Sequence, residues 1–158
     1  MTSTEDAVER VAGLAGERDL TVAAAESLTS GLIAQRLGAG PNAADWFRGS
    51  VVAYQEPVKF DVLGVREGPV ATADAAEEMA LGVARLLGAD VAVAATGVGG
   101  PGPSEGKPAG TVYLAVTVDG QVSARELDLD GDPGQIIEDT ADHALELLLK
   151  TLSELDSS

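Results

Sequence analysis

Apolar residues follow two different spacings along this chain of 158 residues. A spacing of three to four residues marks one face of a helix, whereas a short continuous apolar run of strand length favours a buried strand. Helical spacing predicts helices over residues 4–18, 32–37, 72–88 and 135–154, with a short helix around Pro57–Leu63. Strand-like runs cover Leu20–Ala25, Gly49–Tyr54, Val91–Ala95, Thr111–Val118 and Gln121–Leu129.

The order of these elements predicts the fold. Helices and strands alternate first, and the Asp119-Gly120 pair then predicts a hairpin between the last two strands. We therefore expect an α/β protein with three α/β/α layers and a mixed, mostly parallel sheet of about five strands. No linker, repeat or low-complexity tract divides the chain, so residues 1–158 are expected to form a single domain.

Three polar or Gly-rich segments follow the ends of predicted strands, at residues 26–31, 54–59 and 96–108. Ligands of open α/β sheets bind beyond the carboxyl ends of the strands. These three segments are therefore expected to meet and form the functional site.

The charge of the chain narrows the classes of partner. There are 26 Asp and Glu residues against 10 Lys and Arg residues, which gives a net charge of −16. Nucleic acids and anionic membranes are both bound through clustered cations, so neither is an expected partner. The sequence shows no signal peptide and no apolar run long enough to span a bilayer, which predicts a soluble, cytoplasmic protein.

The acidic residues are spread along the chain, and only three of the ten basic residues are lysines. This pattern favours a solvated surface adapted to a salt-rich cytoplasm over a surface that binds one cationic partner. Salt screens repulsion among such charges, with a Debye length of ~3 Å near 1 M. We expect a higher melting temperature in molar KCl than in dilute buffer, measured by circular dichroism. A melting temperature that stays flat or falls with added salt would contradict this interpretation.

Several apparent metal, phosphate or histidine motifs fail on inspection. The sequence around Lys107 lacks the glycine and hydroxyl positions of a phosphate-binding P-loop. Asp128, Asp130 and Asp132 resemble a calcium loop, but Pro133 stands where the turn glycine belongs, so a charged edge strand is the better interpretation and no metal site is predicted. The chain has no cysteine, and its one histidine, His143, lies within a predicted helix and is interpreted as a surface or packed residue.

One pair of residues remains as candidate chemistry. Ser27 lies where a strand ends and a helix begins, so that backbone N–H groups of residues 28–31 could face a developing oxyanion. A serine nucleophile needs a base, and Lys59 could serve if burial lowered its pKa. The simpler alternative is that Ser27 or Thr29 only caps a helix and that Lys59 is a solvated helix residue.

Four segments in order resemble the CinA C-terminal domain family, the nicotinamide-nucleotide amidohydrolases. The family's Ala-Glu-Ser-Cys-Thr-Gly-Gly appears as Ala25–Gly31, with Leu28 for Cys and Ser30 for the first Gly. Its Tyr-Ser-Asn-x-x-Lys appears as Tyr54–Lys59, and its Thr-Gly-Ile-Ala-Gly-Pro as Thr96–Pro101. Its Lys-Pro-Val-Gly-Thr-Val appears as Lys107–Val112, and the resemblance covers nearly the whole chain.

The resemblance implies hydrolysis of nicotinamide mononucleotide to nicotinate mononucleotide and ammonia, without metal or redox cofactor. By position, Ser27 resembles the nucleophile, Lys59 the base, and Tyr54 a partner in the proton network. The residues that it implies for substrate binding are Glu26, Thr29, Gly31, Thr96, Gly97, Gly100 and Lys107, with the 97–110 loop as a wall of the pocket. Relatives also suggest a homodimer.

The chain departs from the family in the segment before its last helix. Many relatives carry Gly-Asp-Arg followed by further Arg there, whereas this chain has Gly131-Asp132-Pro133 and no Arg through Glu138. If those cations bind the substrate phosphate, their loss weakens nucleotide binding, although Lys107 could substitute in part. Two alternatives therefore stay open: a binding domain with little turnover, and an amidohydrolase for a less anionic amide.

Overall fold

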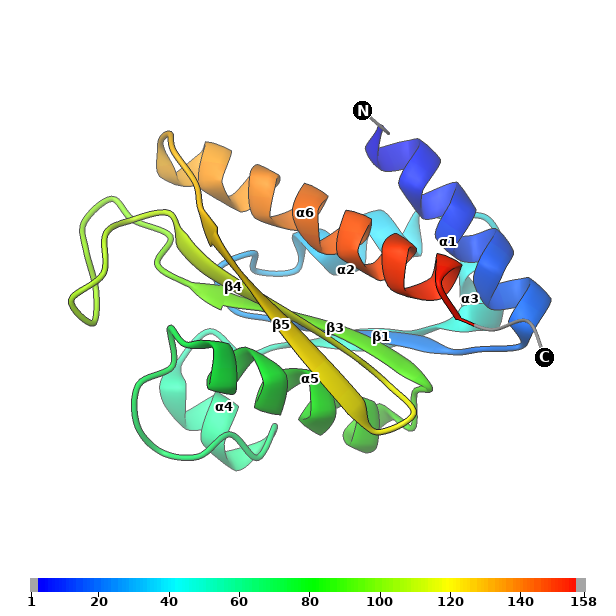
Figure 1. Ribbon diagram of the computed structural model, residues 1–158, viewed down its shortest axis with the longest axis horizontal. Coiled ribbons are helices and arrows are strands. Elements are labelled where there is room, and N and C mark those ends of the chain that lie inside the picture. Colours follow the sequence, from blue (N-terminus) through cyan, green and yellow to red (C-terminus); the bar gives the residue numbers. More distant parts are fainter. Residues whose placement is uncertain (1–2, 156–158) are drawn as a thin grey trace.

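The protein folds into three layers, with a twisted sheet between two layers of helices (Figure 1). The computed structural model describes residues 3–155. The helices are α1 (Thr4–Arg18), α2 (Leu32–Gly38), α3 (Ala43–Trp46), α4 (Glu56–Asp61), α5 (Ala73–Leu87) and α6 (Pro133–Ser153). The strands are β1 (Val22–Glu26), β2 (Phe47–Val52), β3 (Val91–Gly97), β4 (Thr111–Val118) and β5 (Gln121–Asp128).

The strand order in the sheet is β2-β1-β3-β4-β5. Strand β1 pairs in parallel with both β2 and β3, whereas β4 runs antiparallel to β3 and to β5. The expected mixed sheet of five strands is confirmed. The parallel pairings are two of the four rather than the majority, because the hairpin adds β4 and β5 as consecutive antiparallel strands. The carboxyl ends of β1, β2 and β3 consequently meet at one edge.

Alternate residues of the central strands enter two separate cores, because successive side chains of a strand point to opposite faces. On one face, Val22, Val93 and Leu114 pack with α1, α2 and α6. On the other face, the strands present mainly alanine to α5, including Ala23 and Ala94. These small side chains let α5 lie close to the sheet. The larger apolar side chains of the strands lie on the opposite face.

The three long helices begin at local side-chain caps. The hydroxyls of Ser3 and Thr72 accept hydrogen bonds from backbone N–H groups at the starts of α1 and α5, and Asp132 does so for α6. In the hairpin turn, Asp119 and Gly120 have φ of 53° and 78°, as a tight two-residue turn requires. The four-residue helix α3 is the element that the sequence did not predict, since it is too short to show a helical period.

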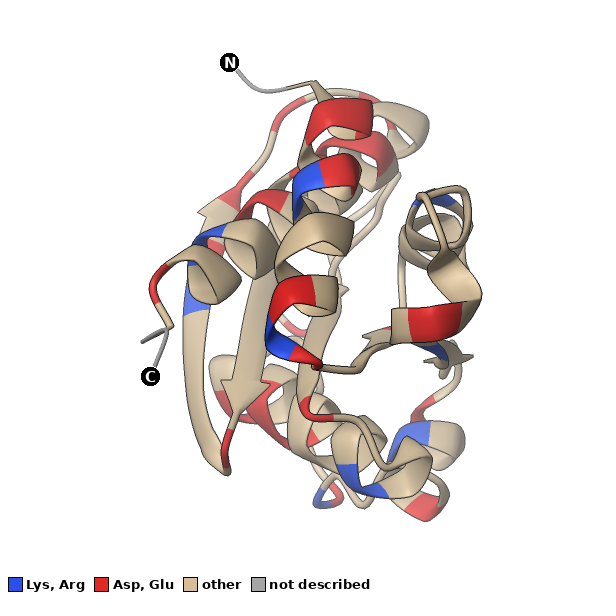
Figure 2. Cartoon of the chain, turned by 90° about the vertical axis from the view of Figure 1, so that its right-hand side faces the viewer, with Lys and Arg blue, Asp and Glu red and all other residues tan. Residues whose placement is uncertain are grey.

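Acidic residues occur on the helices of both layers and on the connecting loops rather than in one patch (Figure 2). The edge strand β5 is mostly exposed, as expected for the charged strand that carries Glu126 and Asp128. None of the helices within residues 3–155 is long and apolar enough to cross a membrane.

The close approach of α5 to the chain after α4 generates a prediction about Gly82. A Cβ at this position would lie 1.9 Å from the carbonyl oxygen of Leu63, so Gly82→Ala forces the helix and this backbone apart. We expect it to lower the free energy of unfolding by about 1–3 kcal/mol, measured by urea denaturation. The matched control is Gly13→Ala in α1, where a Cβ has nothing within 4 Å. This variant is expected to stabilise the protein by about 0.5–1 kcal/mol, and a loss of stability equal to that of Gly82→Ala would contradict the packing argument.

Candidate active site

A cleft of about 430 Å³ lies at the edge where the parallel strands end. The turn after β1, the segment from Tyr54 to Lys59 and the loop after β3 all contribute to its lining, so the predicted convergence of these three segments is found. The segment before α5 adds Val70 and Ala71, and the start of α6 adds Pro133 and Ile137.

Ser27 is the first residue of the turn after β1. Its backbone N–H donates to the carbonyl of Ala95 at 3.1 Å, which extends the pairing of β1 with β3 by one residue. The residue is 8% exposed and lines the cleft. Within residues 3–155, its hydroxyl has no hydrogen-bond partner, and neither do the backbone N–H groups of Leu28 and Thr29. A reacting group in the cleft can therefore engage the Ser27 hydroxyl without displacing an existing contact. Leu28 lines the cleft as well, whereas Thr29 does not.

Lys59 is a buried lysine on α4 that lines the same cleft and is only 2% exposed. Its Nζ donates a hydrogen bond to the backbone carbonyl of Tyr54 at 3.2 Å. Burial lowers the pKa of Lys59 below its ordinary value of 10.5, while the nearby carboxylates of Glu56 and Glu105 oppose part of that shift. The amine is therefore easier to deprotonate than a solvated lysine, as a general base requires.

Ser27 and Lys59 share the cleft, but no hydrogen bond joins their side chains in the described part of the chain. Tyr54 also lines the cleft, yet its side chain is 66% exposed and its contact with Lys59 is made by the backbone carbonyl. The three predicted catalytic residues are thus brought together, with the Tyr54 backbone rather than its hydroxyl bound to the lysine.

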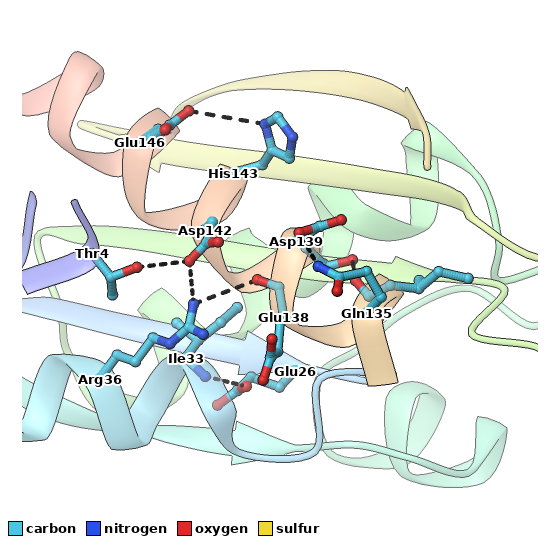
Figure 3. A network of polar contacts seen from close by, with 12 residues as sticks. Thr4, Glu26, Ile33, Arg36, Gln135, Glu138, Asp139, Asp142, His143 and Glu146 are labelled. Carbon is cyan, nitrogen blue, oxygen red and sulfur yellow. Dashed lines mark hydrogen bonds and ion pairs between the residues drawn. The ribbon is translucent and has the colours of Figure 1, made fainter. Parts of the chain in front are cut away.

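The carboxylate of Glu26 is fully buried beneath the turn that carries Ser27. It accepts five hydrogen bonds: from the hydroxyls of Thr29 and Ser50, at 2.7 and 3.0 Å, and from the backbone N–H groups of Gly31, Ile33 and Ala34, at 2.9–3.1 Å. Figure 3 shows the bond from Ile33. The carboxylate therefore occupies the N-terminus of α2.

This arrangement corrects two expectations. Glu26, Thr29 and Gly31 were predicted as substrate contacts, but they bind one another and do not line the cleft. The N–H groups at the start of α2 were expected to face an oxyanion, but Glu26 takes those of Gly31 and the first turn. Only the N–H groups of Leu28 and Thr29 remain from that predicted set.

Ser30 stands in the same turn where the resemblance places a glycine. Its φ of 52° lies in the left-handed region, which a residue with a Cβ adopts at a cost of about 1 kcal/mol or more. The turn nevertheless keeps the conformation, because Glu26 fixes the residues on either side of Ser30.

The loop after β3 forms one wall of the cleft. Thr96 is 1% exposed and donates to the carbonyl of Val70 at 2.9 Å. Gly97 and Gly100 line the cleft as predicted, and Gly97 has no room for a Cβ, which would lie 2.4 Å from the carbonyl oxygen of Thr111. Lys107 does not line the cleft: its Nζ donates to the carbonyl of Ala71 and lies 4.8 Å from the ring centre of Tyr113.

Two acidic residues of the cleft were missed in the sequence. Glu56 begins α4 beside Lys59, and Glu105 lies in the loop after β3 and contacts the backbone of Val70 and Ala71. Both are among the many acidic residues of the chain, and nothing in their spacing separates them from surface carboxylates. Only their tertiary position beside Lys59 identifies them.

The polar residues of α6 that Figure 3 labels are not among the residues that line the cleft. His143 is half-exposed, and its Nδ1 lies 3.9 Å from the Glu146 carboxylate, which confirms its interpretation as a surface residue. Asp142 accepts a 2.6 Å contact from Arg36 of α2 and ties these two helices together. Within residues 3–155, no group of three His, Asp or Glu side chains could hold a metal ion.

The chain is thus an α/β protein with one cleft beyond the ends of its parallel strands. A serine hydroxyl and a buried lysine both line this cleft. The model of the CinA C-terminal domain matches residues 4–152, and the chain belongs to this family. A CinA-like protein of Frankia casuarinae is 40% identical over 160 residues, which cover 98% of this chain and 37% of that protein. A putative competence-damage inducible protein of Desulforamulus reducens is also 40% identical, over 90% of this chain and 36% of its own length.

The chain therefore spans little more than a third of the length of these curated relatives. Solved structures confirm the fold. The crystal structure of a CinA superfamily protein from Klebsiella pneumoniae superposes with a TM-score of 0.92 at 30% identity, covering 97% of this chain and 99% of that one. A competence/damage inducible protein from Agrobacterium tumefaciens superposes with a TM-score of 0.83 at 31% identity, covering 98% and 100%.

The burial of Glu26 generates a stability prediction. Glu26→Gln replaces one acceptor oxygen with an NH₂ group, which cannot accept from the backbone N–H of Ala34. A buried donor left without an acceptor costs about 1–3 kcal/mol, so we expect urea denaturation to show a loss of that size. Glu126→Gln, on the exposed strand β5, removes the same charge and is the control. Equal effects of the two substitutions would show that net charge, rather than the network, determines the loss.

Proposed function

We propose that this domain is an amidohydrolase that converts nicotinamide mononucleotide to nicotinate mononucleotide and ammonia by a Ser–Lys mechanism. One observation carries the proposal: a serine hydroxyl that has no hydrogen-bond partner within residues 3–155 and a buried lysine with a lowered pKa line the same cleft. The family supports the assignment, while the activity itself is our inference.

In the first half of the proposed reaction, the neutral amine of Lys59 accepts the proton of the Ser27 hydroxyl. The Ser27 oxygen bonds to the amide carbon, and the carbonyl oxygen becomes an oxyanion. Leu28 lines the cleft, and its backbone N–H, which has no partner within residues 3–155, is the donor available to stabilise it. Donors of this kind contribute about 10²–10³-fold each to a rate.

The C–N bond then breaks, and the proton held by Lys59 passes to the departing nitrogen, so that ammonia leaves and an acyl-serine remains. A water molecule attacks this ester, with Lys59 again accepting a proton that it passes to the departing Ser27 oxygen. The carboxylic acid so formed gives its remaining proton to solvent and is released as the carboxylate. Such nucleophile–base pairs are often longer in the free enzyme and shorten when substrate binds. The absence of a direct Ser27–Lys59 bond is therefore compatible with this sequence of steps.

The charge of the cleft favours a second candidate, an amidohydrolase for a less anionic amide. The described lining includes the carboxylates of Glu56 and Glu105, while Lys59, whose charged form burial disfavours, is its one basic residue. No arginine lines it, so a bound phosphate dianion would meet two negative charges without a dedicated cation. A domain that binds a nucleotide without turnover is the third possibility, and the same assay distinguishes all three.

The decisive measurement is ammonia release in molar salt from nicotinamide mononucleotide and from the corresponding nucleoside, which lacks the phosphate. We expect Ser27→Ala to lower kcat by about 10³-fold or more, and Lys59→Met by about 10²–10⁴-fold. Lys150→Met, at an exposed position of α6, removes the same charge outside the cleft and should leave the rate unchanged. The wild-type kcat/KM should rise with pH through a pKa below the ordinary lysine value, because only the neutral amine accepts a proton.

Each failure has a distinct meaning. Turnover that survives Ser27→Ala would refute the nucleophile, and faster turnover of the nucleoside would favour the less anionic substrate class. Saturable binding without ammonia release would favour the binding domain.

Stability gives an independent check on Lys59. The unfolded chain binds the Lys59 proton more tightly than the folded chain does, so the free energy of unfolding should rise with pH between the lowered pKa and 10.5. Lys59→Met should remove this component of the pH dependence.

A further inference from the structure

A two-residue segment, Val70–Ala71, forms the part of the cleft wall that precedes α5 and lies in no helix or strand. All four of its backbone polar groups are bound by side chains from β3 and the loop that follows it. The N–H groups of Val70 and Ala71 donate to the two oxygens of Glu105, each at 2.9 Å. The carbonyl of Val70 accepts from Thr96, and that of Ala71 accepts from Lys107.

The loop presents Glu105 and Lys107 from a closed turn. Backbone hydrogen bonds link Ser104 and Lys107 in both directions, at 3.0 and 2.9 Å. The two central residues, Glu105 and Gly106, have φ of 52° and 73°, as in the tightest hairpin turns. A glutamate in the left-handed region is uncommon and is kept where surrounding contacts fix it, as the bidentate contact with Val70 and Ala71 does here.

We propose that Glu105 is a positioning residue of this site: its carboxylate ties the loop after β3 to the Val70–Ala71 segment and fixes a negative charge on the cleft wall that Lys59 also lines. The inference rests on the proposed function for its catalytic meaning. The contact of the Glu105 carboxylate with Val70 and Ala71, and the charge that it brings to the cleft, do not depend on that function. Without this contact, the segment would keep its carbonyl contacts with Thr96 and Lys107 but lose the partner of both N–H groups, which would loosen its attachment to the loop.

The groups that face Lys59 are few. Glu56 lies on the same helix, Tyr54 precedes that helix, and Glu105 approaches from the loop. Among the described lining residues, those from the turn after β1, from β3 and from α6 carry no acidic or basic side chain. The carboxylates of Glu56 and Glu105 both raise the pKa of Lys59 against the larger effect of burial. Glu105 thus limits how far burial can lower the pKa of Lys59. Because the same carboxylate also holds the loop against Val70 and Ala71, the loop couples the shape of the cleft to the proton affinity of the lysine.

The test uses the small number of lysines in the chain. With only Lys59, Lys107 and Lys150 present, lysine labelled with ¹³C at Cε gives three side-chain NMR signals, whose titration can be followed individually and assigned by substitution. Hydrogen exchange at the amides of Val70 and Ala71 reports the contact with Glu105. The variants are Glu105→Gln, which removes the charge and one acceptor; Glu56→Gln, which removes only the neighbouring charge; and Glu67→Gln, an exposed acid beside the same loop that does not line the cleft.

We expect Glu105→Gln to speed exchange at one or both of these amides and to lower the pKa of Lys59. Glu56→Gln should lower the pKa of Lys59 without changing the exchange, and Glu67→Gln should change neither. In the active enzyme, the acid limb of kcat/KM should move to lower pH in Glu105→Gln and Glu56→Gln, and KM should rise in Glu105→Gln alone.

Unchanged exchange at Val70 and Ala71 in Glu105→Gln, or a Lys59 titration identical to that of Glu67→Gln, would overturn the proposal. These NMR readouts need no substrate. If the wild-type protein releases no ammonia from any amide tested, the proposed function fails, whereas the exchange and titration still decide the role of Glu105.

Discussion

The buried carboxylate of Glu26 connects the parts of the structure on which the site depends. It ends β1, accepts from Ser50 of the neighbouring strand β2, and takes the backbone N–H groups at the start of α2. The turn that carries Ser27 is therefore held at both ends by one side chain. Because a carboxylate in the interior is stable only when its oxygens are fully hydrogen-bonded, the turn has little freedom to adopt another conformation. The rigidity of the proposed nucleophile thus comes from the residue beside it in the sequence.

The other side of the cleft depends on contacts between segments far apart in the chain. Lys59 on α4 is buried, and within residues 3–155 the hydrogen-bond partner of its Nζ is a backbone carbonyl. Another part of the lining is assembled from the Val70–Ala71 segment and the loop after β3, joined by Glu105, Thr96 and Lys107. The position of this part of the cleft therefore depends on contacts between residues at least 26 positions apart in the sequence.

The net charge of −16 has different consequences at the surface and in the cleft. At the surface the acids are dispersed and strongly solvated, so each has little effect on its neighbours. In the cleft Glu56 and Glu105 act on a buried amine, where screening by water is weaker. An acidic composition that fits a salt-rich environment therefore also alters the chemistry of the site, and it bears directly on whether a phosphorylated substrate is accepted.

The sequence by itself determined the elements and their order: the helical periods of α1, α5 and α6, the hairpin at Asp119-Gly120, and the meeting of Ser27, Lys59 and Thr96 beyond strand ends. These follow from local spacing and turn chemistry, which act over a few residues. Tertiary structure alone decided that Thr29 and Gly31 bind the Glu26 carboxylate, and that these three residues and Lys107 lie outside the lining of the cleft. It also identified Glu105 and Glu56 among many similar acids, because hydrogen-bond partners and burial depend on segments that the sequence keeps apart.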